Sequence, residues 1–247
     1  MSLTANWLDA LDGTNALAAT IEFSRHGYRQ QADPLDVVRV PFEEADPVRA
    51  FVSYPGKRNF EGKLWLASTR RHVPFESFWE RAFLAILDRT GDVAGVSSQP
   101  MWIRWRSPKR SHAPDYFVRR ADGSGLLVDV RPKELIKAED EVKFELTRRL
   151  AAALGWSYLV LDDLPGATEA NLRFLLRYRD PAWLEGVDVA ALGLSGSMTL
   201  GSLVAALSPV ARSGHAAAYA LVWNGVASAR LERPLSMSTI VIFGGGA

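Results

Sequence analysis

Residues 112–133 read His112-Ala-Pro-Asp-Tyr-Phe-Val-Arg-Arg-Ala-Asp-Gly-Ser-Gly-Leu-Leu-Val-Asp-Val-Arg-Pro-Lys133. Strand-forming residues occupy positions 116–118 and 126–130, and turn-forming residues at 121–125 separate them. This spacing predicts a β-hairpin. We expect a register that brings Asp115 and Asp129 to the same end of the hairpin, with their carboxylates side by side.

These two carboxylates predict a cation between them. Like charges at one point repel unless a cation joins them, and oxygen ligands suit Mg²⁺ or Mn²⁺. Arg131 and Lys133 follow directly, and the backbone carbonyl of Val130 is a further candidate ligand. Carboxylates, a divalent metal and a cationic side chain at one strand end make a site that can hydrolyse a phosphodiester.

A third carboxylate, Glu80, lies in a helix predicted at about residues 75–89. Apolar residues recur there at helical spacing, namely Phe75, Trp79, Phe83, Ile86 and Leu87. The neighbours of Glu80 one turn further on are apolar, and a carboxylate at the edge of an apolar face is costly unless it is paired or binds a cation. Two interpretations stay open. Glu80 either pairs on the side of Arg81 or extends to solvent, or it is a metal ligand.

Four short motifs follow one another in a defined order. They are Ser77-Phe-Trp-Glu-Arg-Ala-Phe-Leu84, Ser98-Gln-Pro100, His112-Ala-Pro-Asp115 and Val128-Asp-Val-Arg-Pro132. The ordered set resembles the TnsA-like endonuclease subunits of heteromeric transposases, which belong to the PD-(D/E)xK, restriction-endonuclease-like superfamily. The resemblance covers roughly residues 73–165. It departs from the pattern at one position, because Arg131 stands where the motif has lysine.

The resemblance implies a function and a set of site residues. Glu80, Asp115 and Asp129 would hold one or two Mg²⁺ or Mn²⁺ ions, and Arg131 or Lys133 would fill the role of the motif lysine. Gln99 would lie near the edge of the sheet, where a purely structural hydrogen bond is an equally good interpretation. The implied activity is cutting of DNA at transposon ends, beside a separate DDE-type transposase and a regulatory ATPase. A homodimer is a further expected arrangement.

The expected fold class is α/β (α+β), a restriction-endonuclease-like mixed sheet flanked by helices, with a small C-terminal winged-helix-like module. Predicted strands at 64–69, 100–106 and 156–161 join the hairpin, and predicted helices lie at 139–154 and 168–178. A crossover helix between strands makes a mixed sheet with helices on its faces.

Three regions follow from this order. Residues 1–70 are expected to form a β-rich extension with short strands at 37–40 and 50–54, and residues 71–180 the nuclease core. Residues 181–247 are expected to form the winged-helix-like domain, with helices at 200–207 and 215–223 and strands at 227–231 and 239–243. A small helical addition packed on the core is the alternative for this last region.

Basic residues gather near Asp115. The candidate DNA-binding residues are Arg104, Arg106, Lys109, Arg110 and Arg119, and no other acidic residue occurs from 102 to 120. A basic surface beside an acidic metal centre suits a phosphate backbone. Because the net charge of the chain is only +1, an ordinary solvated basic loop is the competing interpretation.

Composition excludes several other classes of site. There is no cysteine and there are only four histidines, which excludes disulfides, thiol nucleophiles and cysteine-ligated metals. We expect a cytoplasmic protein, because the absence of cysteine fits a reducing compartment. The N-terminus also lacks the pattern expected of a signal peptide. The uncharged stretch 189–211 contains three Gly and four Ser, so we expect no membrane span there.

Two classes of function remain from the sequence. One is a metal-dependent endonuclease, acting in transposition or in a defence system that uses the same core. The other is a non-catalytic DNA-binding or scaffold subunit that keeps the nuclease fold, with Arg131 marking lost activity.

Overall fold

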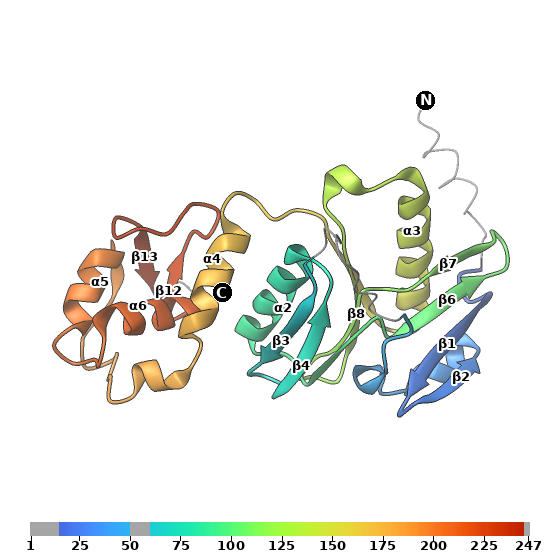
Figure 1. The fold of residues 1–247 in the computed structure, drawn as a ribbon, viewed down its shortest axis with the longest axis horizontal. Coiled ribbons are helices and arrows are strands. Elements are labelled where there is room, and N and C mark those ends of the chain that lie inside the picture. The colour runs from blue at the N-terminus through green and yellow to red at the C-terminus, as the bar shows by residue number, and fades with distance from the viewer. Residues whose placement is uncertain (1–14, 50–59, 245–247) are drawn as a thin grey trace. The chain divides into compact units, whose positions relative to one another are not determined.

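The structure is a computed structural model that describes residues 15–49 and 60–244 (Figure 1). It is a mixed α+β fold with several antiparallel sheets and, among the described residues, five α-helices. This confirms the expected fold class and is compatible with a nuclease-like core. The chain divides into two compact units between Asp163 and Leu164, earlier than the boundary expected at 180/181. The two units are described separately below.

The first unit begins with a β-rich segment that joins the core directly. A four-stranded antiparallel sheet has the order β2-β1-β6-β7. Its strands are β1 (Ala19–Arg25), β2 (Tyr28–Ala32), β6 (Met101–Trp105) and β7 (Arg110–His112). Within the described part of the region expected to form an extension, β1 pairs with β6, a strand of the expected core.

Two short strands expected in this segment have different outcomes. The strand at 37–40 is wrong, because Val37 ends the 3₁₀ helix η1 (Pro34–Val37). Proline at the first helical position favours that turn. The strand at 50–54 lies outside the described residues.

The predicted hairpin is confirmed and forms the centre of a second sheet of order β10-β9-β8-β5. Its strands are β5 (Gly95–Ser98), β8 (Tyr116–Arg119), β9 (Gly125–Val130) and β10 (Ser157–Leu161). Gly123 in the turn has φ of 84°, a left-handed conformation that glycine adopts without strain. The pair β9–β10 is parallel and the other pairs are antiparallel, so the sheet is mixed.

Helices cover the two faces of this second sheet (Figure 1). Successive strand residues point to opposite faces, so Phe117 and Leu127 lie in one core cluster with residues of α3 (Ala138–Ala153). Tyr116 and Val128 lie in the other cluster, with residues of α2 (Phe78–Thr90). α3 is also the crossover between the parallel strands β9 and β10. The inner face of the first sheet packs into the α3 cluster.

A small antiparallel ribbon precedes α2 and consists of β3 (Gly62–Leu66) and β4 (Arg71–Phe75). One strand was expected here, at 64–69, and the structure turns at 67–70 and adds the second strand. α2 begins after Ser77, whose hydroxyl accepts a hydrogen bond from the backbone N–H of Glu80. This N-cap fixes the position of Glu80 in the first helical turn.

The second unit holds helices around a three-stranded antiparallel sheet of order β11-β13-β12. Its helices are α4 (Thr168–Leu175), α5 (Leu200–Leu207) and α6 (Gly214–Trp223), and its strands are β11 (Gly196–Thr199), β12 (Ala227–Ala229) and β13 (Ile240–Phe243). The helices and two strands expected here are present, and β11 is an additional strand. The winged-helix assignment stays a prediction.

A buried side chain of α4, Asn171, makes hydrogen bonds within this second unit. Asn171 donates to the carbonyls of Leu231 and Arg233 at 2.7 Å and accepts from the N–H of Leu235 at 3.3 Å. These bonds tie α4 to the segment between β12 and β13. Among the described helices, none has both the length and the apolar character that a membrane span requires.

Candidate active site

The first unit contains a cavity of about 570 Å³ where the two sheets, α2 and α3 meet. Its lining includes Arg49, Glu76, Glu80, Trp102, His112, Asp115, Asp129, Val130, Arg131, Asp140 and Lys143. All three predicted carboxylates, Val130 and Arg131 are thus at one place. Lys133 is not among the residues that line it.

Asp115 and Asp129 lie at the same end of the hairpin, as the expected register requires. Tyr116 pairs with Val128, so each aspartate is the next residue beyond that pair, on opposite strands. Asp115 Oδ2 accepts a hydrogen bond from the N–H of Val130 at 2.8 Å. Burial raises the pKa of Asp115 well above its usual range, and the charges of Asp129 and Glu80 raise it further. Negative charge therefore accumulates at this point.

Asp129 is buried at the end of β9. Only 3% of its surface is accessible. Its Oδ2 accepts a hydrogen bond from the hydroxyl of Tyr158 and lies 2.8 Å from His112 Nε2. Burial and the nearby Asp129 charge raise the pKa of Tyr158, which keeps this hydroxyl protonated as a donor. His112 and Tyr158 thereby hold one oxygen of Asp129 in place.

Glu80 faces the cavity from the first turn of α2. Its Oε2 accepts from the N–H of Glu76 at 2.8 Å and from the hydroxyl of Tyr116 at 3.2 Å, and its Oε1 accepts from Ser77 Oγ at 3.0 Å. Burial raises the pKa of Glu80. Arg81 lies over the ring of Phe78, 4.8 Å from its centre. The carboxylate of Glu80 is thus held toward Tyr116 and the cavity.

The two candidates for the lysine role are placed differently. Arg131 Nε donates to the carbonyl of Leu135 at 3.2 Å, and its Nη2 lies 3.7 Å from Asp140 Oδ2. Lys133 is exposed, because the chain turns after Pro132 into the 3₁₀ helix η3 (Lys133–Leu135). Lys133 therefore does not line the cavity that contains the acidic residues.

Lys143 brings an ammonium group to the cavity from α3. Its Nζ lies 2.8 Å from Asp140 Oδ1, and its side chain is 24% accessible. Lys143 is not among the site residues predicted from the sequence, because the prediction of a helix at 139–154 does not show which of its polar side chains face the site. The signal available was the Asp140–Lys143 spacing of three, which places both on one side of a helix. Arg49 is a second missed cation of the cavity, and its charge lowers the pKa of Asp115 against the larger effects that raise it.

Gln99 is buried and connects the backbone of Asp115 with the side chain of Glu76. It is 2% accessible, its N–H donates to the carbonyl of Asp115 at 2.7 Å, and its Nε2 donates to Glu76 Oε2 at 3.1 Å. Its φ of 48° is unusual for a residue other than glycine. Gln99 therefore has the structural hydrogen bonds that were one of its two interpretations, and they position the segment that carries Asp115.

The five candidate DNA-binding residues separate into two groups. Arg104 is on β6, Arg106 and Lys109 lie in the turn after it, and Arg110 begins β7. Arg119 lies at the far end of β8, paired with Glu43 at 3.2 Å and bonded to the carbonyl of Gly123. Arg119 therefore makes structural contacts at the hairpin turn, at the end of β8 that lies away from Asp115.

The donor set of the cavity suits a hard divalent cation. Asp115, Asp129 and Glu80 supply only oxygen atoms, which Mg²⁺ and Mn²⁺ prefer. Burial raises the pKa of Asp115 and the charges of Asp129 and Glu80 raise it further, so a cation between these carboxylates would stabilise the ionised form. Within residues 15–49 and 60–244, no three histidine or acidic side chains are already arranged as the ligands of one ion. The carboxylate of Glu80 already accepts hydrogen bonds from Glu76 and Ser77 at the start of α2. Asp115 and Asp129 are therefore the leading candidates for metal ligands.

Comparison with known proteins adds no assignment. No family model matches the sequence, and no curated protein matches it. The function of the protein is therefore inferred from its own residues and their geometry.

Proposed function

We propose that the protein is a metal-dependent DNA endonuclease subunit, similar to the TnsA-like subunits of heteromeric transposases. It would cut phosphodiester bonds at transposon ends in the cytoplasm, together with a separate DDE-type transposase and a regulatory ATPase. One observation carries the proposal. Asp115 and Asp129 lie side by side at a strand end, in a cavity that also contains Glu80 and the ammonium group of Lys143.

In this proposal Asp115 and Asp129 hold Mg²⁺ or Mn²⁺, with Glu80 and the carbonyl of Val130 as further ligands. The metal supplies Lewis-acid polarisation of the phosphoryl oxygen and a lowered pKa for a bound water. His112 and Tyr158 fix the orientation of Asp129, as outer partners of metal ligands commonly do.

Lys143 is the candidate for the role of the motif lysine. Its ammonium is a compact charge that can stabilise negative charge on the phosphate or orient the attacking water. Asp140 holds it at 2.8 Å. The planar guanidinium of Arg131 is a poor general base, so its role here is to pair with Asp140 and the η3 carbonyl. Lys133 has no role at the acids in this proposal.

DNA would approach over the β6–β7 hairpin. Arg104, Arg106, Lys109 and Arg110 lie on or beside its turn, and His112 at the end of β7 lines the acid cavity. Contacts of these cations with phosphates would position the backbone without reading sequence.

A non-catalytic DNA-binding scaffold is the second candidate, and one observation favours it. The position of the motif lysine holds Arg131, which is turned toward Asp140. In that case the acids would be a remnant of the fold and Lys143 would serve only its ion pair with Asp140.

A plasmid-cutting assay separates the two candidates. Supercoiled plasmid is incubated with the protein, with Mg²⁺, Mn²⁺ or EDTA, and with or without the partner transposase. The nuclease proposal expects nicked or linear product with either metal and none with EDTA. Absence of product under every metal condition, with the partner present and DNA binding intact, would favour the scaffold.

A further inference from the structure

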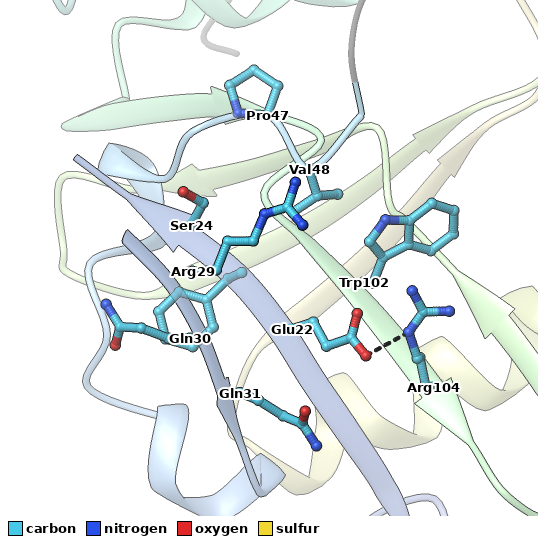
Figure 2. A pocket seen from close by; sticks show the side chains of 10 residues that line it. Glu22, Ser24, Arg29, Gln30, Gln31, Pro47, Val48, Trp102 and Arg104 are labelled. Carbon is cyan, nitrogen blue, oxygen red and sulfur yellow. Dashed lines mark ion pairs between the residues drawn. The ribbon is translucent and has the colours of Figure 1, made fainter. Parts of the chain in front are cut away.

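The outer face of the first sheet carries a polar groove next to the acid cavity. Ile21, Phe23 and Met101 point into the core, so their strand neighbours point outward. Across the sheet, Glu22 pairs with Gln31 on one side and with Trp102 on the other. These residues line a cavity of about 540 Å³, shown in Figure 2, a volume within the usual range of small-ligand sites, about 300–1,000 Å³.

An indole ring forms one wall of this groove. Trp102 is half-buried on an otherwise polar sheet face, and Figure 2 shows its ring beside Arg104. The guanidinium carbon of Arg104 is 5.2 Å from the centre of the ring, and that of Arg49 is 5.9 Å away. Arg104 is also held by Glu22 at 2.7 Å. Both guanidinium groups therefore lie over the indole ring as cation–π partners.

The opposite wall of the groove supplies hydrogen-bonding groups. Arg29, Gln30 and Gln31 are exposed on β2, and Arg29 pairs across the sheet with Ser24 of β1. In Figure 2 the side chain of Arg29 extends over the groove toward Val48. The groove thus combines an aromatic face, amides and guanidinium groups. Its acid, Glu22, is already paired with Arg104.

The groove and the acid cavity share a wall. Trp102 lines both of them. Arg49, whose guanidinium lies near the same ring, lines the acid cavity. A ligand in the groove would therefore lie next to the acid cavity.

We infer that this groove binds an unpaired nucleotide of a DNA strand, with its base stacked on Trp102 and its phosphates beside Arg29 and Arg104. The inference rests on the proposed nuclease function and adds the site that holds the strand next to the cut. Aromatic faces bind single-stranded nucleic acid by stacking, with cations along the backbone. A base inside an intact duplex cannot present its face to Trp102, so the occupant is a single-stranded end, a frayed end or a flipped base.

The test measures binding in EDTA, where no metal-dependent cutting occurs. Fluorescence anisotropy of a labelled 12-nucleotide DNA strand is compared with that of a blunt duplex. Trp102→Ala should weaken binding of the single strand by about 5- to 100-fold and leave the blunt duplex unchanged. Trp102→Phe, which keeps an aromatic face, should retain most of the affinity. Trp65→Ala is the matched control, because Trp65 is 39% accessible on β3, outside the groove.

A second pair of variants keeps the inference testable if Trp102→Ala does not fold. Arg29→Ala should weaken binding of the strand and reduce its salt dependence, since one phosphate contact is lost. Arg71→Ala, an exposed arginine on β4, should do neither.

Three outcomes would overturn the inference. The first is that Trp102→Ala and Arg29→Ala bind the single strand with unchanged affinity. The second is that the variants bind the single strand and the duplex equally more weakly, and the third is that an RNA strand binds more tightly than DNA in a way that depends on Trp102. Because binding is measured without metal, these results are separate from the plasmid assay. Trp102-dependent binding without any metal-dependent cutting would uphold the groove and reject the nuclease.

Discussion

Replacing Asp115 with asparagine keeps the shape of the side chain and removes one negative charge from the acid cavity. The amide oxygen of asparagine can still accept the hydrogen bond from Val130. Because burial and the charges of Asp129 and Glu80 raise the pKa of Asp115, the wild-type carboxylate is destabilising when ionised. Asp115→Asn should therefore make the metal-free protein more stable and at the same time remove its response to Mg²⁺.

The size of both effects follows from the geometry. Opposite residues of an antiparallel pair have Cβ atoms about 5 Å apart, and two unit charges at that distance repel by about 3 kcal/mol at an effective dielectric constant of about 20. An acid whose pKa is raised by folding contributes nothing below its unfolded pKa and destabilises increasingly as pH rises toward the folded value. The stabilisation by Asp115→Asn should thus be absent at acid pH and reach about 1–3 kcal/mol above the raised pKa.

The assay is thermal unfolding with and without Mg²⁺. A metal at 100 times its Kd stabilises the wild type by about 2.7 kcal/mol, which corresponds to a rise in Tm of about 5–10 °C. Asp115→Asn should show a higher Tm without metal and no rise with it. Asp122→Asn, in the exposed turn of the same hairpin, is the control and should respond as the wild type does. An equal Mg²⁺ response in Asp115→Asn and the wild type would show that Asp115 is not a metal ligand.

Three further predictions concern catalysis, the second unit and pH. Lys143→Ala should lower the single-turnover cutting rate by about 10²-fold or more, whereas Arg131→Ala should change it by less than about tenfold; the reverse order would return the lysine role to Arg131. Asn171→Ala should destabilise the second unit by about 3 kcal/mol, measured by urea unfolding, because buried carbonyls lose their donor, and an unchanged midpoint would contradict this. Mg²⁺ affinity, measured by calorimetry, should fall as pH decreases through the raised pKa values of Asp115 and Glu80, since protons compete with the metal; a flat profile would mean that these carboxylates are not ligands.

The local sequence pattern was sufficient to predict the hairpin and the helix that carry the acidic residues of the cavity. Alternation and turn chemistry predicted the hairpin of β8 and β9, and the apolar spacing at 75–89 predicted α2 within a few residues. The α5 bounds, Leu200–Leu207, agree with the expected 200–207. In each case the side chains involved are close in sequence, so their periodicity reports directly on the buried face.

Contacts between residues far apart in the sequence could not be predicted from local sequence pattern. Tyr158 reaches Asp129 from 29 positions away, and Arg119 pairs with Glu43 from 76 positions away. Nothing in the sequence near Arg119 distinguishes it from a DNA-binding arginine. Strands β5 and β11, which begin with Gly95 and Gly196, are rich in Gly and Ser, and they become strands only because β8 and β13 pair with them.

The most direct test of the central claim is the cutting rate of Asp115→Ala and Asp129→Ala in the plasmid assay, with saturating Mg²⁺ and the partner transposase present. Both variants should bind DNA as the wild type does and should yield no nicked or linear product above the EDTA background. Asp122→Ala should cut at the wild-type rate. Cutting at the wild-type rate by Asp115→Ala or Asp129→Ala would show that the paired carboxylates are not the catalytic metal site.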